Sequence, residues 1–236
     1  MNIIITGASE GIGYQTAMRF AAEKENHVLA VARSVDKLEQ LKAEVQSASL
    51  SGKVSILAYD IRSKKEIGLT KYCSDIGMDR IDVLINNAGL LINKPFEELT
   101  WEDWQAIYET NVIGLARLTA VLLPIMGGDK ASHIINISSM GGIPHTSKFA
   151  GLSAYSSSKG AISILSECMA EEFKGKNISV NALALGAVQT EMLKAAFPEY
   201  EAPVTPQEFA SYLYWFATEG NRFINGKVIP VGLASV

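Results

Sequence analysis

Residues 2–13 read NIIITGASEGIG, a short apolar run that breaks at once into a turn with three glycines. The β-branched run at 2–6 predicts a buried strand, and the apolar spacing that continues through Phe20 and Ala21 predicts a helix after the turn. A glycine turn that opens a helix leaves backbone N–H groups and the positive end of the helix dipole pointing outward, which suits a pyrophosphate. A turn that merely tolerates glycine is the simpler interpretation, but it explains one glycine better than three.

The rest of the chain repeats this alternation of strand and helix. The spacing of apolar residues predicts a helix at 153–174, a final helix at about 206–218, and further strands at 27–32, 54–59, 81–85, 132–137, 178–185 and 227–231. Such alternation predicts an α/β fold, a doubly wound parallel sheet of the Rossmann type with helices on both faces. No repeat or linker divides the chain, so we expect a single domain over residues 1–236.

Residues 189–206 differ in composition from the segments around them. They mix apolar side chains such as Phe197 with Pro198, Pro203 and Pro206. Because this mixture suits a covering segment better than a core element, we expect a mobile lid over the substrate there.

Composition and charge exclude several classes of protein. Hydrophobic residues make up 48% of the 236 and charged residues 19%, which is typical of a globular chain and far from the disordered regime. The formal net charge of -4 argues against a nucleic-acid partner, because nucleic-acid binders carry a basic face. The N-terminus lacks the zones of a signal peptide, and no apolar run approaches the ~18 residues of a membrane helix. We therefore expect a cytoplasmic protein with no membrane partner.

Cysteine and histidine are too scattered to indicate a disulfide framework or a metal site. Cys73 and Cys168 lie far apart and outside any C-x-x-C spacing. The three histidines share no ligand spacing with a carboxylate or a cysteine, so no metal is expected.

Small or polar residues follow most of the predicted strands. Those that come directly after a strand are Gly7, Arg33, Asp60, Asn87, Ser139 and Gly186. Parallel sheets bind ligands beyond the carboxyl ends of their strands. We therefore expect these residues to meet at one edge of the sheet.

The end of the second strand indicates which dinucleotide this edge would hold. An acidic residue there would bind the ribose hydroxyls of NAD, whereas an arginine can accept the 2′-phosphate of NADP. The chain has Ala32 where an acid could stand and Arg33 directly after it, which favours NADP(H) over NAD(H). A solvated loop arginine is the alternative, and Glu10 in the glycine turn would repel a phosphate.

Tyr155 and Lys159 lie four residues apart and would share one face of the helix predicted at 153–174. An isolated phenol titrates near pH ~10, and a neighbouring cation favours the phenolate and lowers its pKa. The pair could therefore transfer protons, although a surface helix with one Tyr and one Lys is the simpler interpretation. Asn111 falls within an apolar stripe and is expected to be buried, where it would either tie two helices together or belong to a site.

Three motifs together are far more specific than any one of them. Residues 6–13 match TGxxxGIG, residues 86–89 match NNAG, and residues 155–159 match YxxxK. In this order and at these separations the chain resembles the short-chain dehydrogenase/reductase family over essentially its whole length.

The resemblance implies a catalytic group of four side chains. Tyr155 would act as the acid/base, and Lys159 would lower the Tyr155 pKa and hold the nicotinamide ribose. Ser139 would orient the substrate oxygen, and Asn111 would position a water beside the lysine. The implied reaction interconverts a carbonyl compound and a secondary alcohol by hydride transfer, with NADP(H) preferred. A dinucleotide-binding regulator or scaffold without turnover is the alternative.

The resemblance also implies a cofactor site and an assembly. Asp60 would meet the adenine, Asn87 the adenosine ribose, and Val188 and Thr190 the carboxamide. The whole cofactor-binding set is Gly7, Ser9, Gly11, Ile12, Gly13, Arg33, Ser34, Asp60, Ile61, Asn87, Ala88, Gly89, Tyr155, Lys159, Gly186, Val188 and Thr190. The expected partners are a small carbonyl or alcohol substrate and further copies of the chain in a homodimer or homotetramer.

The chain departs from the family pattern in four places. The loop between Ser139 and Tyr155 is longer than usual, which leaves a choice between Ser138 and Ser139, and we favour the second. Glu10 stands where NADP-dependent relatives often have a basic residue. Leu185 and Gly186 replace Pro-Gly, and residues 230–232 replace the terminal Asp-Gly-Gly. Substrate identity stays open, but apolar walls are expected from Leu90, Leu91, Ile143, Pro144, Phe149, Phe197 and Tyr200.

Overall fold

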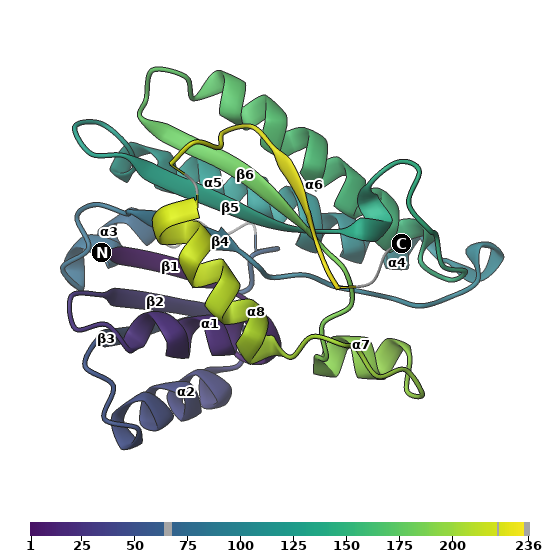
Figure 1. The fold of residues 1–236 in the computed structure, drawn as a ribbon, viewed down its shortest axis with the longest axis horizontal. Coiled ribbons are helices and arrows are strands. Elements are labelled where there is room, and N and C mark those ends of the chain that lie inside the picture. Colours follow the sequence, from purple (N-terminus) through teal and green to yellow (C-terminus); the bar gives the residue numbers. More distant parts are fainter. Residues whose placement is uncertain (64–67, 221, 234–236) are drawn as a thin grey trace.

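The computed structural model describes residues 1–63, 68–220 and 222–233, which form a sheet covered by helices (Figure 1). The sheet has seven strands, all parallel, in the order β3-β2-β1-β4-β5-β6-β7. The strands are β1 (Asn2–Thr6), β2 (His27–Ala32), β3 (Lys53–Ala58), β4 (Val83–Asn86), β5 (Ser132–Ser139), β6 (Ile178–Leu185) and β7 (Val228–Val231). The doubly wound parallel sheet predicted from the sequence is confirmed.

The helices lie on both faces of this sheet (Figure 1). They are α1 (Gly11–Ala21), α2 (Val35–Ser47), α3 (Leu69–Asp75), α4 (Trp101–Tyr108), α5 (Leu115–Leu122), α6 (Ser153–Glu172), α7 (Glu191–Ala196) and α8 (Pro206–Trp215). Residues of α1, α2 and α8 share one buried apolar cluster, and residues of α3, α5 and α6 share the other.

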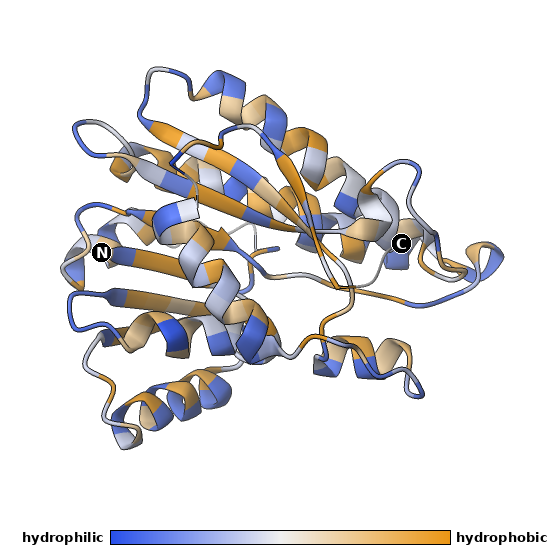
Figure 2. Cartoon of the chain, viewed as in Figure 1, coloured by the Kyte–Doolittle hydropathy of each residue, from blue (hydrophilic) through white to orange (hydrophobic). Residues whose placement is uncertain are grey.

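The alternation of side chains along β1 explains why both faces need a cover. Ile3 and Ile5 belong to the first cluster and Ile4 to the second, and all three are fully buried. Successive residues of a strand point to opposite faces, so a run without polar interruptions needs helices on both sides. Figure 2 shows the central strands as predominantly hydrophobic.

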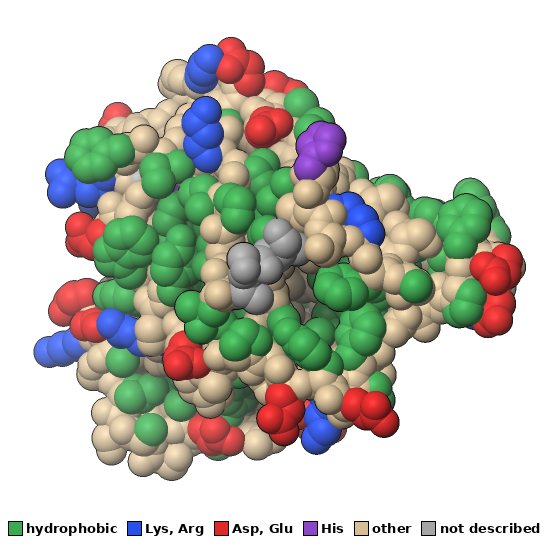
Figure 3. Space-filling view, turned by 45° about the vertical axis from the view of Figure 1, so that its right-hand side comes forward, with side chains coloured by type: hydrophobic (Ala, Val, Ile, Leu, Met, Phe, Trp, Pro, Cys, Tyr) green, Lys and Arg blue, Asp and Glu red, His purple; other side chains and the backbone are tan. Residues whose placement is uncertain are grey.

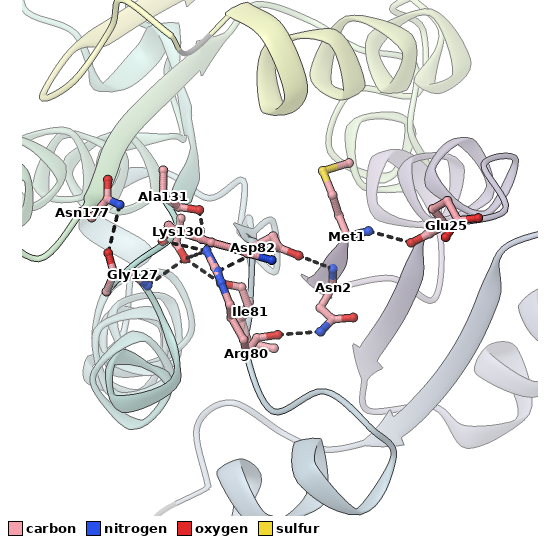
Figure 4. Close-up of polar contacts among 12 residues, drawn as sticks. Met1, Asn2, Glu25, Arg80, Ile81, Asp82, Gly127, Lys130, Ala131 and Asn177 are labelled. Carbon is pink, nitrogen blue, oxygen red and sulfur yellow. Dashed lines mark hydrogen bonds and ion pairs between the residues drawn. The ribbon is translucent and has the colours of Figure 1, made fainter.

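The amino-terminal edge of the sheet is closed by polar contacts (Figure 4). The Asn2 N–H donates to Asp82 Oδ2 at 2.7 Å, and the Asn2 side-chain amide donates to the Arg80 carbonyl at 2.7 Å. The Arg80 guanidinium donates to the carbonyls of Lys130 and Ala131 at 2.8 and 2.6 Å. These bonds join the starts of β1, β4 and β5.

The chain reverses its winding between β1 and β4, which are neighbours in the sheet although β2 and β3 intervene in sequence. The loops that follow these two strands therefore run to opposite faces, and a crevice opens between them at the carboxyl edge. This crevice is where ligands bind in open parallel sheets.

The predicted boundaries hold for most elements, with two informative differences. β5 continues two residues beyond the predicted Ile137, to Ser139, because residues 132–139 pair in register with residues 178–185 of β6. The final helix ends at Trp215, and a wider π-helical turn covers Phe216–Gly220.

Helices α4 and α5 form one continuous helical segment that is interrupted by a π-helical turn at Glu109–Gly114. Thr100 begins it with the expected capping box, in which its side chain accepts from Asp103 N–H and the Asp103 carboxylate accepts from Thr100 N–H. An 18-residue window within Trp101–Ile125 has a mean hydropathy of 1.3, so by length and composition alone this helical segment is apolar enough to cross a membrane, contrary to the expectation from the sequence. Core helices pass the same test, and Ile107, Leu118 and Leu122 are buried.

His133 makes the stability of the fold dependent on pH. Its ring is buried in β5, packs against Phe216, and its Nε2 lies 3.1 Å from the Asn181 side-chain amide. Burial lowers the pKa of His133 to about 3, and burial and nearby positive charge lower that of His27 to about 4. The unfolded chain therefore binds more protons than the folded chain between these values and about pH 6.5.

We expect these two histidines to make the free energy of unfolding fall as the pH drops below 6.5. In His133→Gln the slope of that fall should decrease by about one proton, or ~1.4 kcal/mol per pH unit. Urea unfolding at pH 5 to 8 measures it, with the exposed His145→Asn as control. Equal slopes in wild type and His133→Gln would contradict this account.

Candidate active site

A cleft of about 470 Å³ opens at the carboxyl edge of the sheet and is lined by the segments that follow β1 to β6. Most of the residues predicted for the site line it. Three do not, namely Gly13, Ser34 and Asn111, which lie behind its walls. Residues that line the cleft and were not predicted from the sequence include Arg62, Gly232 and Leu233.

The glycine turn is held in place by its contacts with the loop after β4. Gly7 has a left-handed φ of +67°, and a Cβ on it would lie 2.9 Å from Ala88 Cα. A Cβ on Gly13 would lie only 2.3 Å from the Gly7 carbonyl oxygen. Because Gly13 has no side chain, α1 can pack closely against the turn. Because Gly7 has none, the loops after β1 and β4 can approach each other closely.

A set of hydrogen bonds fastens these two loops together. The Thr6 hydroxyl oxygen accepts from the backbone N–H groups of Asn87 and Ala88, each at 3.0 Å. In return the Asn87 side-chain amide donates to the carbonyls of Thr6 and Gly7 at 3.0 and 3.2 Å. Asn87 therefore shapes the turn as well as lining the cleft.

The N-terminus of α1 fits a pyrophosphate group. Glu10 is the N-cap residue, and its side chain makes no capping hydrogen bond. Gly11 and Ile12, the first residues of the helix, line the cleft. Uncapped N–H groups and the positive end of a helix dipole attract anions. With the glycines that keep side chains out of the turn, the residues present here fit a dinucleotide cofactor.

Two arginines line the cleft where the adenosine end of a dinucleotide would lie. Arg33 is exposed at the end of β2. Arg62 donates to both carboxylate oxygens of Asp60, with its Nη2 2.7 Å from Oδ2. The hydrogen bond from Arg62 lowers the pKa of Asp60, so the carboxylate predicted to meet adenine is already engaged. Arg62 was not predicted because an arginine four residues past the end of β3 has no distinctive spacing.

Glu10 and Ser34 have structural partners that the sequence did not reveal. The Glu10 carboxylate forms an ion pair with Lys37, in the first turn of α2. The Ser34 hydroxyl accepts from the Lys37 N–H at 3.4 Å and caps α2. The negative charge of Glu10 is thus partly offset before any phosphate approaches.

Ser139, Tyr155 and Lys159 meet halfway along the cleft. Ser139 and Tyr155 both line the cleft, the Ser139 side chain acts to lower the pKa of the Tyr155 phenol, and Ser139 Oγ accepts from Gly141 N–H at 3.2 Å. Lys159 is buried, its Nζ lies 5.6 Å from the centre of the Tyr155 ring, and it donates to the Ile137 carbonyl at 2.7 Å. Two hydroxyls and one ammonium therefore face the same part of the cleft.

Ser138 and Ser139 take different positions because successive strand residues point to opposite sides. Ser138 is buried, and its hydroxyl donates to the Lys159 carbonyl at 2.9 Å and contacts the Ser163 hydroxyl at 2.9 Å. Ser138 therefore joins β5 to α6, and Ser139 is the serine whose side chain affects the pKa of Tyr155.

Asn111 lies fully buried in the π-helical turn between α4 and α5. Its amide accepts from Leu90 N–H at 2.7 Å and donates to the Leu90 carbonyl at 3.0 Å. It also donates to the Ser158 hydroxyl at 2.9 Å. A Cβ on Gly89 would lie 3.6 Å from Asn111 Oδ1 and 3.5 Å from Lys159 Nζ. Asn111 thus links the segment between α4 and α5 to α6, as the first of the two alternatives expected, and its role in the site stays a prediction.

Burial dominates the proton affinities of the site. It raises the pKa of Tyr155 to about 12, against a smaller opposite effect of the Ser139 hydrogen bond. It also lowers the pKa of Lys159 to about 8. The expected lowering of the Tyr155 pKa is therefore wrong for the protein alone, because burial of the phenol raises this pKa and the Lys159 ammonium donates to the Ile137 carbonyl instead.

The far end of the cleft is apolar. Of the predicted walls, Leu90, Leu91, Phe149, Phe197 and Tyr200 line it, whereas Ile143 and Pro144 do not. The long loop between Ser139 and Tyr155 instead folds back on itself. Lys148 Nζ donates to the Ile143 and Thr146 carbonyls at 2.7 and 2.9 Å. Among the described residues, no group of three or more His, Cys, Asp or Glu side chains could hold a metal ion.

A parallel sheet with a phosphate-binding glycine turn and a Ser–Tyr–Lys group at its carboxyl edge defines a dinucleotide-binding protein of the oxidoreductase class. The model of the short chain dehydrogenase family matches residues 1–201. The chain belongs to this family, and the resemblance found in the sequence is confirmed.

Individual relatives agree with this assignment. The chain is 30% identical over 241 residues to 3-oxoacyl-(acyl-carrier-protein) reductase FabG of Thermotoga maritima, covering 97% of this chain and 94% of the relative. It is 34% identical over 215 residues to a fatty acyl-CoA reductase of Acinetobacter baylyi, covering 90% and 71%. A short chain dehydrogenase structure from Escherichia coli CFT073, complexed with NADPH, superposes with a TM-score of 0.84 at 27% identity, covering 97% and 95%.

The junction between the loops after β1 and β4 leads to a stability prediction. Thr6→Val keeps the shape of the side chain but removes the acceptor of two N–H groups. We expect the free energy of unfolding to fall by about 1–2 kcal/mol, because the Ala88 N–H loses its acceptor, the Asn87 N–H keeps only the Ile85 carbonyl, and an unpaired N–H costs ~1–3 kcal/mol when buried.

Thr16→Val is the matched control for this substitution. Thr16 is buried in α1 and only donates to the Ile12 carbonyl at 2.7 Å, so its loss should cost much less. Urea unfolding of both variants measures the difference. An equal loss of stability in the two would show that the Thr6 bonds do not hold the loops.

Proposed function

We propose that the protein is an NADP(H)-dependent oxidoreductase that interconverts a carbonyl compound and a secondary alcohol, with Tyr155 as the acid/base. One observation carries this proposal. The side chains of Ser139, Tyr155 and Lys159 line one cleft together with the glycine turn at the N-terminus of α1. A regulator that only binds a dinucleotide has no use for that group.

When bound, the nicotinamide supplies or accepts the hydride. Tyr155 then gives a proton to the carbonyl oxygen or takes one from the alcohol, while the Ser139 hydroxyl holds that oxygen and polarises it. Lys159 is placed to hold the nicotinamide ribose and, by its charge, to favour the phenolate when it forms. Because the pKa of Tyr155 lies near 12, the phenol keeps its proton at neutral pH, which suits reduction of a carbonyl.

NADP(H) is the proposed cofactor, with NAD(H) as the second choice. Arg33 and Arg62 put two positive charges at the adenosine end, and Ala32 leaves no acid to bind the ribose hydroxyls. The ion pair between Glu10 and Lys37 reduces the repulsion that Glu10 would exert on a 2′-phosphate. The relative complexed with NADPH supports the same choice.

Residues 189–206 are proposed to cover the substrate as a lid within the single domain. The segment contains α7 and rejoins the sheet where the Gln189 N–H donates to the Val204 carbonyl at 2.8 Å. Its far side is tethered by Asn93, which donates to the Ala196 carbonyl at 2.8 Å. Single hydrogen bonds such as these could break and let the lid open. The homodimer or homotetramer and the cytoplasmic location stay predictions.

Removing the phenol hydroxyl tests the catalytic role. Tyr155→Phe should lower kcat for NADPH-dependent ketone reduction by about 10²–10⁴-fold, because general acid catalysis contributes that much. NADPH binding, followed by its fluorescence, should stay within about twofold of wild type. Equal rates in the two proteins would refute the assignment of Tyr155 as the acid.

Removing one arginine tests the cofactor. Arg33→Ala should weaken NADPH binding about tenfold and leave NADH binding unchanged, because a hydrogen bond to a charged group contributes ~1.5–3 kcal/mol. Lys24→Ala removes an exposed charge just before β2, at the opposite edge of the sheet, and is the control. Tighter binding of NADH than of NADPH to wild type would overturn the proposed preference.

A further inference from the structure

The substrate end of the cleft is walled by apolar side chains from three separate segments. Leu90 and Leu91 come from the loop after β4, Phe149 and Leu152 from the lengthened loop after β5, and Met192 and Phe197 from the segment that carries α7. The rings of Phe149 and Phe197 meet edge to face at 6.3 Å. The lengthened loop and the proposed lid therefore close on each other through hydrophobic contact.

Charged groups are distributed unevenly along the cleft. Among its described lining residues, the arginines lie at the adenosine end. At the other end the charged side chains are Lys159, which donates to the Ile137 carbonyl, and Glu191, which is exposed. A carboxylate on the substrate would have no cation of its own to pair with there, and an unpaired buried charge is strongly unfavourable.

Hydroxyl groups on a substrate would also lack partners. The side-chain hydroxyls at this end include those of Ser139, Ser147, Tyr155, Ser156 and Tyr200. Ser139 and Tyr155 are needed at the reacting oxygen, so few remain for a compound with a hydroxyl on every carbon. Buried polar groups without partners cost free energy, which disfavours sugars and polyols.

A second hollow adjoins the first. It lies between residues 93–97 and 148–153, and it shares three wall residues with the main cleft: Phe149, Leu152 and Ser156. Its walls also include two charged residues, Glu97 and Lys148, and the Lys148 ammonium already donates to the Ile143 and Thr146 carbonyls. At its sides, Phe96 and Phe149 leave 68% and 60% of their surface exposed. Figure 3 shows hydrophobic side chains on both sides of the cleft mouth and on the lobe that projects beside it.

From these observations we propose that the substrate is an uncharged carbonyl compound, or the matching secondary alcohol, with an elongated apolar body that runs past Leu152 into the second hollow. This inference rests on the proposed function. The reacting oxygen lies at Ser139 and Tyr155, the first carbons lie between the leucines and α7, and the remainder of the chain lies against Phe149 and Phe96. Rings exposed in the free protein are covered when such a substrate binds.

The first experiment measures kcat/KM with NADPH for 2-butanone, 2-hexanone, 2-octanone and 2-decanone. Each added methylene that enters an apolar site should raise kcat/KM by about fourfold. Ethyl acetoacetate should be reduced at least 100-fold faster than acetoacetate, which carries a carboxylate in place of the ethyl ester. Fructose should be a poor substrate. A flat series, or preference for acetoacetate or fructose, would overturn the inference.

The second experiment addresses the second hollow itself. Ala150 is exposed and lines that hollow but not the main cleft, so Ala150→Trp should fill the hollow. The ratio of kcat/KM for 2-decanone to that for 2-butanone should then fall at least tenfold, and in the control Ala150→Ser it should stay as in wild type. An unchanged ratio in Ala150→Trp would contradict the assignment of this hollow to the substrate tail.

A binding measurement separates this inference from the proposed function. With Tyr155→Phe loaded with NADPH, 2-decanone should raise Tm and an equal concentration of fructose should not. Turnover of short ketones without any gain for long ones would refute the inference and leave the proposed function intact. No turnover of any ketone by wild type, although NADPH binds, would refute both.

Discussion

The hydrogen bonds between Thr6 and the backbone of Asn87 and Ala88 are the contacts on which the site depends. They join the loops after β1 and β4, the two strands between which the sheet reverses its winding. Without these hydrogen bonds the width of the crevice between the loops after β1 and β4 would not be fixed. Glycine at position 7 makes the junction geometrically feasible, because any larger side chain would collide with Ala88.

A second constraint is the polar contact between the end of β5 and α6. Ser138 bonds to the Lys159 carbonyl and to Ser163, and deeper in the core Asn136 donates to Ser166 at 2.8 Å. These bonds fix the position of α6 along its own axis relative to β5. They therefore decide how far Tyr155 stands from Ser139, and a shift of one helical turn would separate the two hydroxyls. The reacting geometry is a consequence of buried hydrogen bonds that never touch the substrate.

One end of the cleft is polar and charged and the other is apolar, because the two ends are built from different segments of the chain. The adenosine end is made by short turns after β1, β2 and β3, where the backbone and a few charged residues suffice for phosphate and ribose. The other end is made by the longer segments after β4, β5 and β6, which carry leucine, methionine and phenylalanine. Burial at the middle keeps Tyr155 protonated, so the proton needed for reduction is present where the two ends meet.

The sequence alone determined the alternation of strands and helices, the glycine turn, and the positions of Ser139, Tyr155 and Lys159, because these depend on local pattern or on short motifs. Only the tertiary structure decided the partners of polar groups that lie far apart in sequence. It paired Glu10 with Lys37, occupied Asp60 with Arg62, turned Ser138 toward α6, and placed Asn111 in a π-helical turn where its amide could reach Leu90 and Ser158. It also reversed the expected change in the Tyr155 pKa, because desolvation depends on what surrounds the phenol and not on the residue four positions away.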